Sequence, residues 1–271
     1  MKADFITSSC IGSRGEFGNQ LFQIAAVLGY AHEHGREAIF KEWVCTHSSR
    51  NYSVYFPSLN YRPSIHPKNT YREIRFGYDE IPGKPALDII GSFQSERYFF
   101  SIREEIKKLF QAPSFIDAEV LAYLAAHGIS DYSALHMRYN DRDGIDNNSV
   151  MHNLPEHFFV EAARHLVKGR KVLLISNSPT RAKLFGKKHL KDFDYLVSTN
   201  RNSLVDFYLL TRAQTVIISN STFGWWGGYL NPNVEKVYGP LRRRWFGFPT
   251  RLEHRWSTHD LYPANFVEIP F

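Results

Sequence analysis

The chain of 271 residues carries a formal net charge of +6, and 43% of its residues are hydrophobic, which is ample for a packed core. Its length favours two domains. No segment reaches the roughly 18 to 20 continuous apolar residues of a membrane span, and the first residues lack a signal-peptide pattern. We therefore expect a soluble, cytoplasmic protein.

The positive charge suits anionic ligands but is not gathered in a tail. The three-residue basic run 242–244 lies in a predicted loop between Pro240 and Trp245. Nucleic-acid binding needs a wider basic stripe on a recognisable module, so no nucleic-acid partner is expected. Cys10 and Cys45 show no CxxC spacing, which fits a reducing compartment without a zinc site or disulfide framework.

The first half of the chain begins with a strand, a glycine-containing loop and a helix from about Asn19. The glycines of this loop recur every three residues and do not fit the dinucleotide-binding pattern. Further expected elements are strands at 37–40 and 87–91, a helix capped by Ser101 and Glu104, and a helix at 117–126. Residues 44–85 show no clear period and predict an irregular, exposed segment that could face an acceptor.

The second half alternates strands with helices. Strands are predicted at 133–138, 172–175, 195–197, 215–219 and 234–238, with helices between them. This alternation indicates a doubly wound parallel sheet, in which ligands lie outside the carboxyl ends of the strands. Arg138, Asn177 and Asn220 each follow a strand, so we expect them to converge.

The segment 215–228 is the most informative part of the chain. A buried strand ends at Ser219, and Asn220, Ser221 and Thr222 then open a helix containing Gly224 and two tryptophans. Small polar side chains and the unpaired N–H groups of the first helical turn would stabilise an anion, most simply a diphosphate. The alternative is an N-capped, tightly packed core helix, since capping needs only one of these residues.

Arg138 could hold a phosphate bidentately, with His136 beside it and the helix N-terminus opposite. That arrangement stabilises a diphosphate leaving group without a metal. The alternatives are a surface salt bridge for Arg138 and a satisfied strand-end histidine for His136. Two Asp-x-Asp triplets, 141–143 and 192–194, also match a pattern through which sugar transferases bind Mn²⁺ or Mg²⁺.

Four separated motifs carry a resemblance to a known family. They are residues 15–23, 91–99, 136–141 and 219–227. In order and spacing they resemble the motifs of the α-1,2-fucosyltransferases, glycosyltransferase family 11. The resemblance implies a GT-B-like α/β fold with two Rossmann-like halves facing a cleft. It further implies GDP-L-fucose as donor, no metal or other cofactor, and inverting transfer to a galactosyl hydroxyl of an oligosaccharide acceptor.

On this resemblance, residues 1–129 form the acceptor-side domain and residues 130–271 the GDP-sugar-binding domain, with the C-terminal tail packing back. Arg138 grips the diphosphate, and Asn19 lies close to the reacting centre. The predicted donor-binding residues are Gly18, Gln20, His136, Arg138, Asn177, Ser219, Asn220, Ser221 and Thr222.

The chain departs from the family pattern at three places. Tyr139 and Asn140 replace an arginine and a glycine, Asn177 lies in Ser-Asn-Ser where many members have Ser-Asp-Asp, and Glu16 replaces a glycine. Glu16 is the candidate general base, although it could instead pair with Arg14 or face solvent; Asp141 is a second candidate. Two other functions stay open, namely transfer from another nucleotide-sugar, and GDP or glycan binding without turnover.

Overall fold

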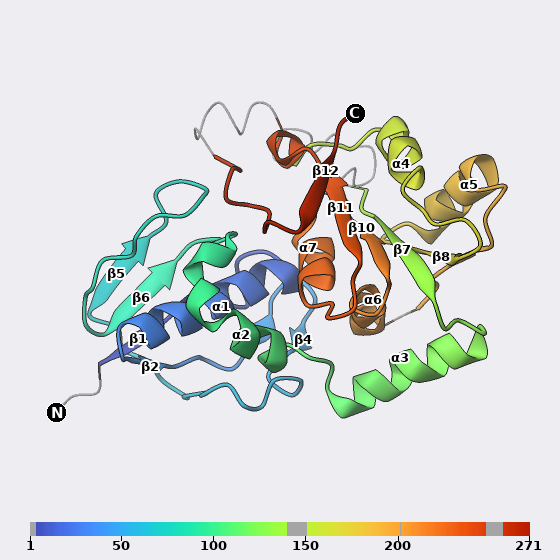
Figure 1. Cartoon of the computed structure of the whole chain (residues 1–271). Helices are drawn as coiled ribbons and strands as arrows, with labels where there is room; N and C mark the ends of the chain where they lie inside the picture. The colour runs from blue at the N-terminus through green and yellow to red at the C-terminus, as the bar shows by residue number, and fades with distance from the viewer. Residues whose placement is uncertain (1–3, 140–150, 201, 248–256) are drawn as a thin grey trace. The chain divides into compact units, whose positions relative to one another are not determined.

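The computed structural model describes residues 4–139, 151–200, 202–247 and 257–271. The chain divides into two compact units, and each is built on its own parallel sheet, which confirms the predicted α/β class (Figure 1). The first unit comprises Met1–Gln111 and His254–Pro263, and the second comprises Ala112–Glu253 and Ala264–Phe271. The sequence placed the division after residue 129, and in the structure α3 (Ser114–Ala126) falls in the second unit.

The first unit contains a four-stranded parallel sheet in the order β2-β1-β6-β5. Its strands are β1 (Phe5–Thr7), β2 (Glu37–Ala38), β5 (Asn69–Arg72) and β6 (Leu87–Ile90). The long helix α1 (Phe17–Glu33) packs on β1 and β2 and buries most of its residues. Gly29 lets α1 approach the main chain of Tyr98, where a larger residue would collide.

Residues 44–85 were expected to be irregular, and the structure corrects this. A short antiparallel pair, β3 (Val44–Cys45) and β4 (Arg50–Asn51), lies here, and β5 joins the parallel sheet beside β6. The sequence of β5, Asn-Thr-Tyr-Arg, is polar because this edge strand is only half buried. Hydrophobic periodicity could not reveal it.

The capping box predicted at Ser101 is also wrong. The chain passes through the short 3-10 helices η1 (Glu96–Tyr98) and η2 (Phe100–Ile102) before α2 (Arg103–Leu109) begins. Ser101 therefore lies inside η2, and its hydroxyl donates to the Glu33 carboxylate at 3.2 Å. This contact ties the segment to α1.

The second unit contains a six-stranded parallel sheet in the order β12-β11-β10-β7-β8-β9. Its strands are β7 (Tyr132–Met137), β8 (Lys171–Ser176), β9 (Tyr195–Val197), β10 (Thr215–Ile217), β11 (Lys236–Pro240) and β12 (Phe266–Ile269). β12 comes from the C-terminal tail and pairs with β11. β7 and β10 lie at the centre, and both are fully buried.

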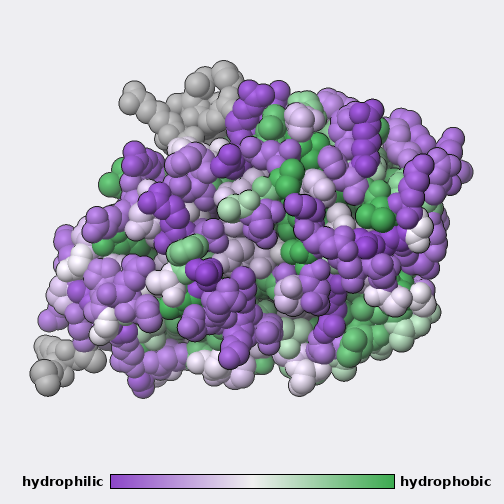
Figure 2. Space-filling model, in the orientation of Figure 1, coloured by the Kyte–Doolittle hydropathy of each residue, from purple (hydrophilic) through white to green (hydrophobic). Residues whose placement is uncertain are grey.

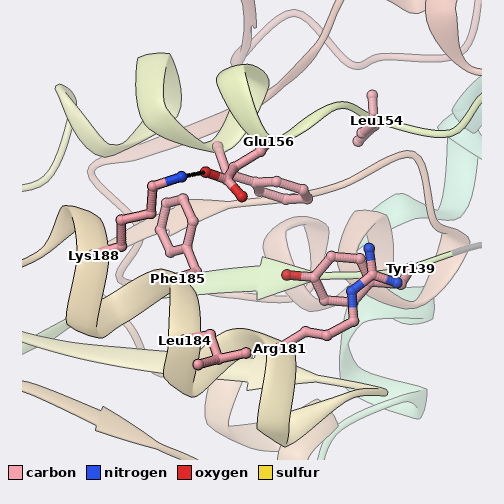
Figure 3. A pocket seen from close by; sticks show the side chains of 8 residues that line it. Tyr139, Leu154, Glu156, Arg181, Leu184, Phe185 and Lys188 are labelled. Atoms are coloured by element: carbon pink, nitrogen blue, oxygen red, sulfur yellow. Dashed lines mark hydrogen bonds and ion pairs between the residues drawn. The ribbon is translucent and has the colours of Figure 1, made fainter.

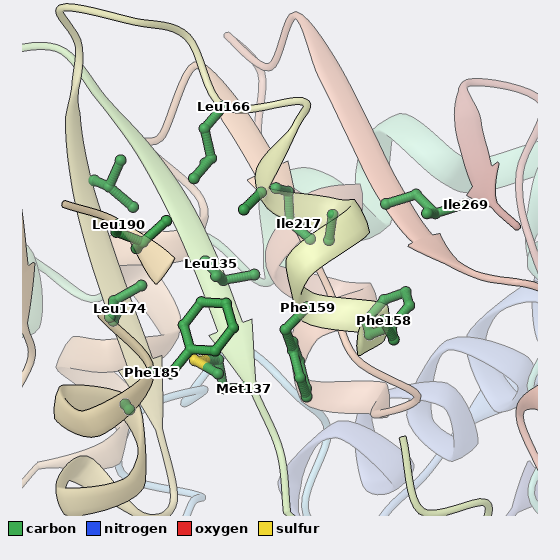
Figure 4. Packing of buried hydrophobic residues seen from close by; sticks show 14 residues of the cluster. Leu135, Met137, Phe158, Phe159, Leu166, Leu174, Phe185, Leu190, Ile217 and Ile269 are labelled. Carbon is green, nitrogen blue, oxygen red and sulfur yellow. The ribbon is translucent and has the colours of Figure 1, made fainter. Parts of the chain in front are cut away.

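Helices cover this sheet on both faces. These helices are α4 (Glu156–Ala163), α5 (Pro179–His189), α6 (Ser203–Leu210) and α7 (Thr222–Tyr229). The short 3-10 helix η3 (Arg242–Arg244) follows β11. Side chains of a strand alternate between its two faces. Leu135 and Met137 join the hydrophobic core that α4 and α5 cover (Figure 4), whereas His136 between them contacts α7 on the opposite face.

The visible surface is mostly hydrophilic, with hydrophobic patches scattered between polar side chains (Figure 2). In the described part of the chain, none of the helices combines the length and the apolar character that a bilayer crossing requires. Cys10 and Cys45 are both buried free thiols.

Candidate functional site

Three neighbouring strands of the second unit end beside one another. β7 lies between β10 and β8, with Leu135 opposite Ile217 and Met137 opposite Ser176. Because the strands are parallel, the residues that follow them share one edge of the sheet. The sequence predicted that Arg138 and the segments after β8 and β10 converge, and the strand pairing confirms this.

A single hydroxyl joins two of these strand ends. The Ser219 Oγ accepts the main-chain N–H of Arg138 at 3.2 Å and lies 3.1 Å from His136 Nδ1. Since this oxygen already accepts a hydrogen bond from the Arg138 N–H, its own hydrogen is available to the imidazole of His136. The Nδ1 atom accepts that hydrogen bond when the ring carries its own hydrogen on Nε2. Ser219 therefore fixes the end of β7 against the start of α7.

His136 is a buried, neutral part of this junction. Its ring stacks on Phe223 with centroids 5.5 Å apart, and a Cβ added at Gly224 would lie 2.7 Å from its Nδ1. Burial, followed by the nearby charge of Arg138, lowers the pKa of His136 to about 3. His136 therefore contributes shape at neutral pH rather than positive charge.

Arg138 places a positive charge at this edge. It is half-buried, and its guanidinium makes no hydrogen bond or ion pair with any residue that the structure describes. Next to it α7 begins, and Ser221, the residue before the helix, makes no side-chain capping bond. The first N–H groups of a helix have no partner inside it, so they and Arg138 can share an anion.

Asn177 and Tyr139 hold the ends of β8 and β7 together. The Asn177 amide nitrogen donates to the Tyr139 carbonyl at 2.9 Å, and its oxygen accepts the Tyr139 N–H at 2.9 Å. The Arg181 guanidinium from α5 lies over the Tyr139 ring, 3.7 Å from its centroid. A cation therefore reaches the neighbourhood of Tyr139, the position where the resemblance expects an arginine, although it comes from another element.

A cavity of about 200 Å³ lies beside Tyr139 and Arg181, between α4 and α5 (Figure 3). Leu154, Phe159 and Phe185 supply apolar walls, and Glu156 pairs with Lys188 at 2.7 Å. Ligand pockets commonly measure about 300–1,000 Å³. The cavity is therefore too small for a whole nucleotide-sugar.

Asn220 has internal partners that the sequence could not reveal. It is 1% exposed, and its amide nitrogen donates to the carbonyls of His152 at 2.7 Å and Trp245 at 3.0 Å. This side chain holds two distant segments against the loop after β10. Ser221 and Thr222, in contrast, are half-buried and border solvent.

The predicted residues of the first unit gather at the start of α1. Asn19 is half-buried, and its Oδ1 accepts a hydrogen bond from Gln94 Nε2 at 2.8 Å. Gly18 is buried, and buried Gln20 donates to the Gly15 carbonyl at 2.7 Å while accepting from the Trp43 indole. Glu16 precedes the helix and is exposed. Gln20 thus holds the turn before α1, next to Glu16 and Asn19.

These two groups of residues belong to different units, and their meeting across one cleft stays a prediction. The sequence reasoning missed Gln94 as a partner of Asn19, although the motif 91–99 contains it. It also missed Glu73, which lies in the segment expected to be irregular and accepts hydrogen bonds from the main-chain N–H groups of Ser92 and Phe93.

The Asp-x-Asp alternatives are only partly covered by the structure. Asp194 pairs with Lys171 at 3.2 Å and Asp192 is exposed, whereas Asp141 and Asp143 lie outside the described residues. Within the described ranges, no three or more His, Cys, Asp or Glu side chains gather in a way that could hold a metal ion.

The model of glycosyl transferase family 11 matches residues 10–237. The chain is 25% identical over 252 residues to an alpha-1,2-colitosyltransferase of Escherichia coli, covering 80% of this chain and 85% of the relative. It is 27% identical over 251 residues to a galactoside 2-alpha-L-fucosyltransferase of Caenorhabditis elegans, covering 82% and 68%.

The fold is similar to that of the fucosyltransferase NodZ from Bradyrhizobium. The TM-score is 0.60 at 16% identity, and the match covers 88% of this chain and 94% of NodZ. This likeness supports the GT-B-like fold predicted from the sequence. Because the family model spans most of the chain, the protein is a glycosyltransferase that belongs to glycosyl transferase family 11.

Proposed function

We propose that this protein transfers L-fucose from GDP-L-fucose to a galactosyl hydroxyl of an oligosaccharide, with inversion, to form an α-1,2 linkage. The observation that carries the proposal is the junction at Ser219, which joins the end of β7, with Arg138, to the start of α7. The relatives named for α-1,2-colitosyl and galactoside 2-α-L-fucosyl transfer support the sugar class and the linkage. NodZ, which has been soaked with GDP-fucose in the crystal, supports the donor class.

The donor diphosphate would bind between Arg138 and the first turn of α7. A guanidinium matches two phosphate oxygens at once, and the helix dipole favours negative charge at its N-terminus. Ser221 and Thr222 border this turn and would add hydroxyl donors. His136, Ser219 and Asn220 would keep the turn in place from behind.

The same groups would stabilise the leaving group, so we propose that transfer needs no metal. As the bond between C1 of fucose and the diphosphate oxygen breaks, its electron pair leaves with GDP. Arg138 and the N–H groups of α7 face the negative charge that develops there. Fixed donors of this kind act most strongly on charge that appears in the transition state.

The acceptor would be activated from the first unit. Its hydroxyl oxygen forms the new bond to C1 from the face opposite GDP, and its proton passes to the carboxylate of Glu16. Asn19 would position the acceptor or the sugar beside Glu16. Glu16 suits this role because it is exposed at the start of α1.

GDP-colitose is the second candidate donor, because an α-1,2-colitosyltransferase is among the relatives that match most of the chain. Colitose is L-fucose without its 3-hydroxyl group. A site built to hydrogen-bond that hydroxyl would reject the deoxy sugar strongly, by roughly 10⁴-fold. A site without such a bond would accept both donors.

The test is GDP release from GDP-L-fucose, GDP-colitose and GDP-mannose with galactose-ended acceptors, in the presence of EDTA. The expected result is turnover of GDP-fucose and an α-1,2 linkage in the product by NMR. Preference for GDP-colitose would move the proposal to the second donor. GDP binding with no turnover of any donor, or activity abolished by EDTA, would contradict it.

A further inference from the structure

Glu73 lies directly after β5, at the carboxyl end of the first unit's sheet. Its two carboxylate oxygens accept the main-chain N–H groups of Ser92 at 2.5 Å and Phe93 at 3.0 Å. Ser92 and Phe93 follow the neighbouring strand β6. The carboxylate therefore holds the turn that leaves β6, which we call the 91–95 loop (residues 91–95).

The 91–95 loop has a backbone shape that needs such support. Phe93 has a φ of +49°, in the left-handed region that residues with a side chain rarely adopt. Strained backbone of this kind persists only where the surroundings hold it. Gly91 lets Glu73 approach, because a Cβ at residue 91 would lie 2.5 Å from the Glu73 Cβ.

The residue after Phe93 reaches the proposed reaction site. Gln94 is buried, and its Nε2 donates to Asn19 Oδ1 at 2.8 Å. Asn19 also packs against Gly15, where an added Cβ would lie 2.5 Å from its Nδ2. One continuous set of contacts thus runs from Glu73 through the 91–95 loop and Gln94 to Asn19.

We propose that Glu73 is a positioning residue for glycosyl transfer: it fixes the 91–95 loop, and through Gln94 it sets the orientation of the Asn19 side chain. This role rests on the proposed function, in which Asn19 lies beside the reacting atoms. Glu73 is half-buried, and both of its carboxylate oxygens are bonded to main-chain N–H groups, so we assign it no part in proton transfer to the acceptor. The sequence offered no signal for it because its partners are main-chain groups about twenty residues further along.

The charges around Glu73 are consistent with a carboxylate held by N–H groups rather than by a salt bridge. Burial raises its pKa to about 7, while the two N–H donors and the more distant Arg14 oppose the rise, and Asp79 adds to it. The two N–H bonds are thus the contacts that favour the ionised carboxylate, whereas burial disfavours it.

The test compares Glu73→Gln with Glu80→Gln, an exposed glutamate of the same unit. We expect Glu73→Gln to lower kcat by about 10-fold to 100-fold, the effect of small misplacements near reacting atoms, without changing GDP affinity measured by calorimetry. Gln94→Ala should lower kcat by a similar factor. The variant that combines Glu73→Gln with Gln94→Ala should have a kcat no lower than that of the single variants. Glu80→Gln should match the wild type.

A wild-type kcat for Glu73→Gln, or single effects that multiply in the double variant, would overturn the proposal. If Glu73→Gln does not fold, Gln94→Ala carries the test, because it leaves the Glu73 contacts intact, and an unchanged kcat overturns it. The side-chain amide NMR signal of Asn19 separates this proposal from the proposed function. It should shift in Glu73→Gln and stay in place in Glu80→Gln, whichever donor the enzyme uses.

Discussion

The main-chain N–H of Arg138 and the hydroxyl of Ser219 meet at 3.2 Å across two neighbouring parallel strands. The contact places the first residue after β7 against the turn that opens α7. The same hydroxyl lies 3.1 Å from His136 Nδ1, so one small side chain that follows β10 contacts two groups at the end of β7. The position of the candidate cation therefore depends on a buried serine.

Ser219→Ala should test this dependence. Removing the hydroxyl leaves a buried N–H and a ring nitrogen without their partner, which costs about 1–3 kcal/mol of unfolding free energy. The affinity for GDP should fall as well, because Arg138 loses its anchor. Denaturant unfolding and calorimetry with GDP measure the two effects.

Ser133→Ala is the matched control. Ser133 is a fully buried serine on β7 whose hydroxyl has no hydrogen-bond partner among the described residues. Its removal should change the unfolding free energy by less than about 0.5 kcal/mol and leave GDP affinity intact, because no bond is lost. Equal effects of the two substitutions would mean that the Ser219 bonds contribute nothing specific.

Arg138→Ala should abolish transfer while the protein stays folded. The guanidinium has no described partner, so its loss leaves no buried charge unpaired, whereas the departing diphosphate loses its cation. We expect kcat to fall by roughly 100-fold or more. Arg164→Ala, which removes an exposed arginine paired with Glu161 at 2.7 Å, should have no such effect. Near-normal turnover of Arg138→Ala would exclude the residue from the mechanism.

Glu16→Gln separates acceptor activation from donor binding. The amide cannot take the acceptor proton, so kcat should fall by roughly 100-fold or more, while GDP affinity is unchanged. Steady-state kinetics with both substrates varied, together with GDP calorimetry, distinguish these outcomes. If kcat stays at the wild-type value, Glu16 is not the base.

The sequence predicted the second unit more completely than the first. β7, β8 and β10 are buried strands with apolar cores, which their residues reveal directly. β5 is a polar edge strand whose place in the sheet depends on pairing with β6. Pairing between strands distant in the chain leaves no local pattern, so it could not be predicted.

The same difference applies to the site. Arg138 was predicted because a cation directly after a buried strand is visible in one short motif. The partners of Asn220 lie 68 and 25 residues away, and Gln94 lies 75 residues from Asn19. Residues that act through such remote contacts, as we propose for Glu73, become visible only when the folded chain brings them together.

Glu73 and His136 should give stability opposite dependences on pH. Burial raises the pKa of Glu73 from 4.5 to about 7, so the folded state holds a proton that the unfolded state releases. Its contribution to stability is complete below pH 4.5 and is lost as the pH rises towards 7. The pKa of His136 is lowered from 6.5 to about 3, so its contribution is complete above pH 6.5 and is lost as the pH falls towards 3.

Glu73→Gln therefore tests a stability effect that is independent of activity. The difference between 4.5 and about 7 corresponds to a contribution on the order of 3 kcal/mol that the wild type loses between these pH values. The glutamine at residue 73 cannot titrate, so in this variant nothing opposes the rise of stability with pH that His136 causes. The unfolding free energy of the variant should therefore rise more steeply with pH over this range than that of the wild type. Denaturant unfolding at pH 5, 6 and 7 measures both slopes, with Glu80→Gln as the control that should keep the wild-type slope. Parallel pH profiles for the wild type and Glu73→Gln would show that Glu73 ionises as an ordinary exposed glutamate does, in contradiction to its burial against the 91–95 loop.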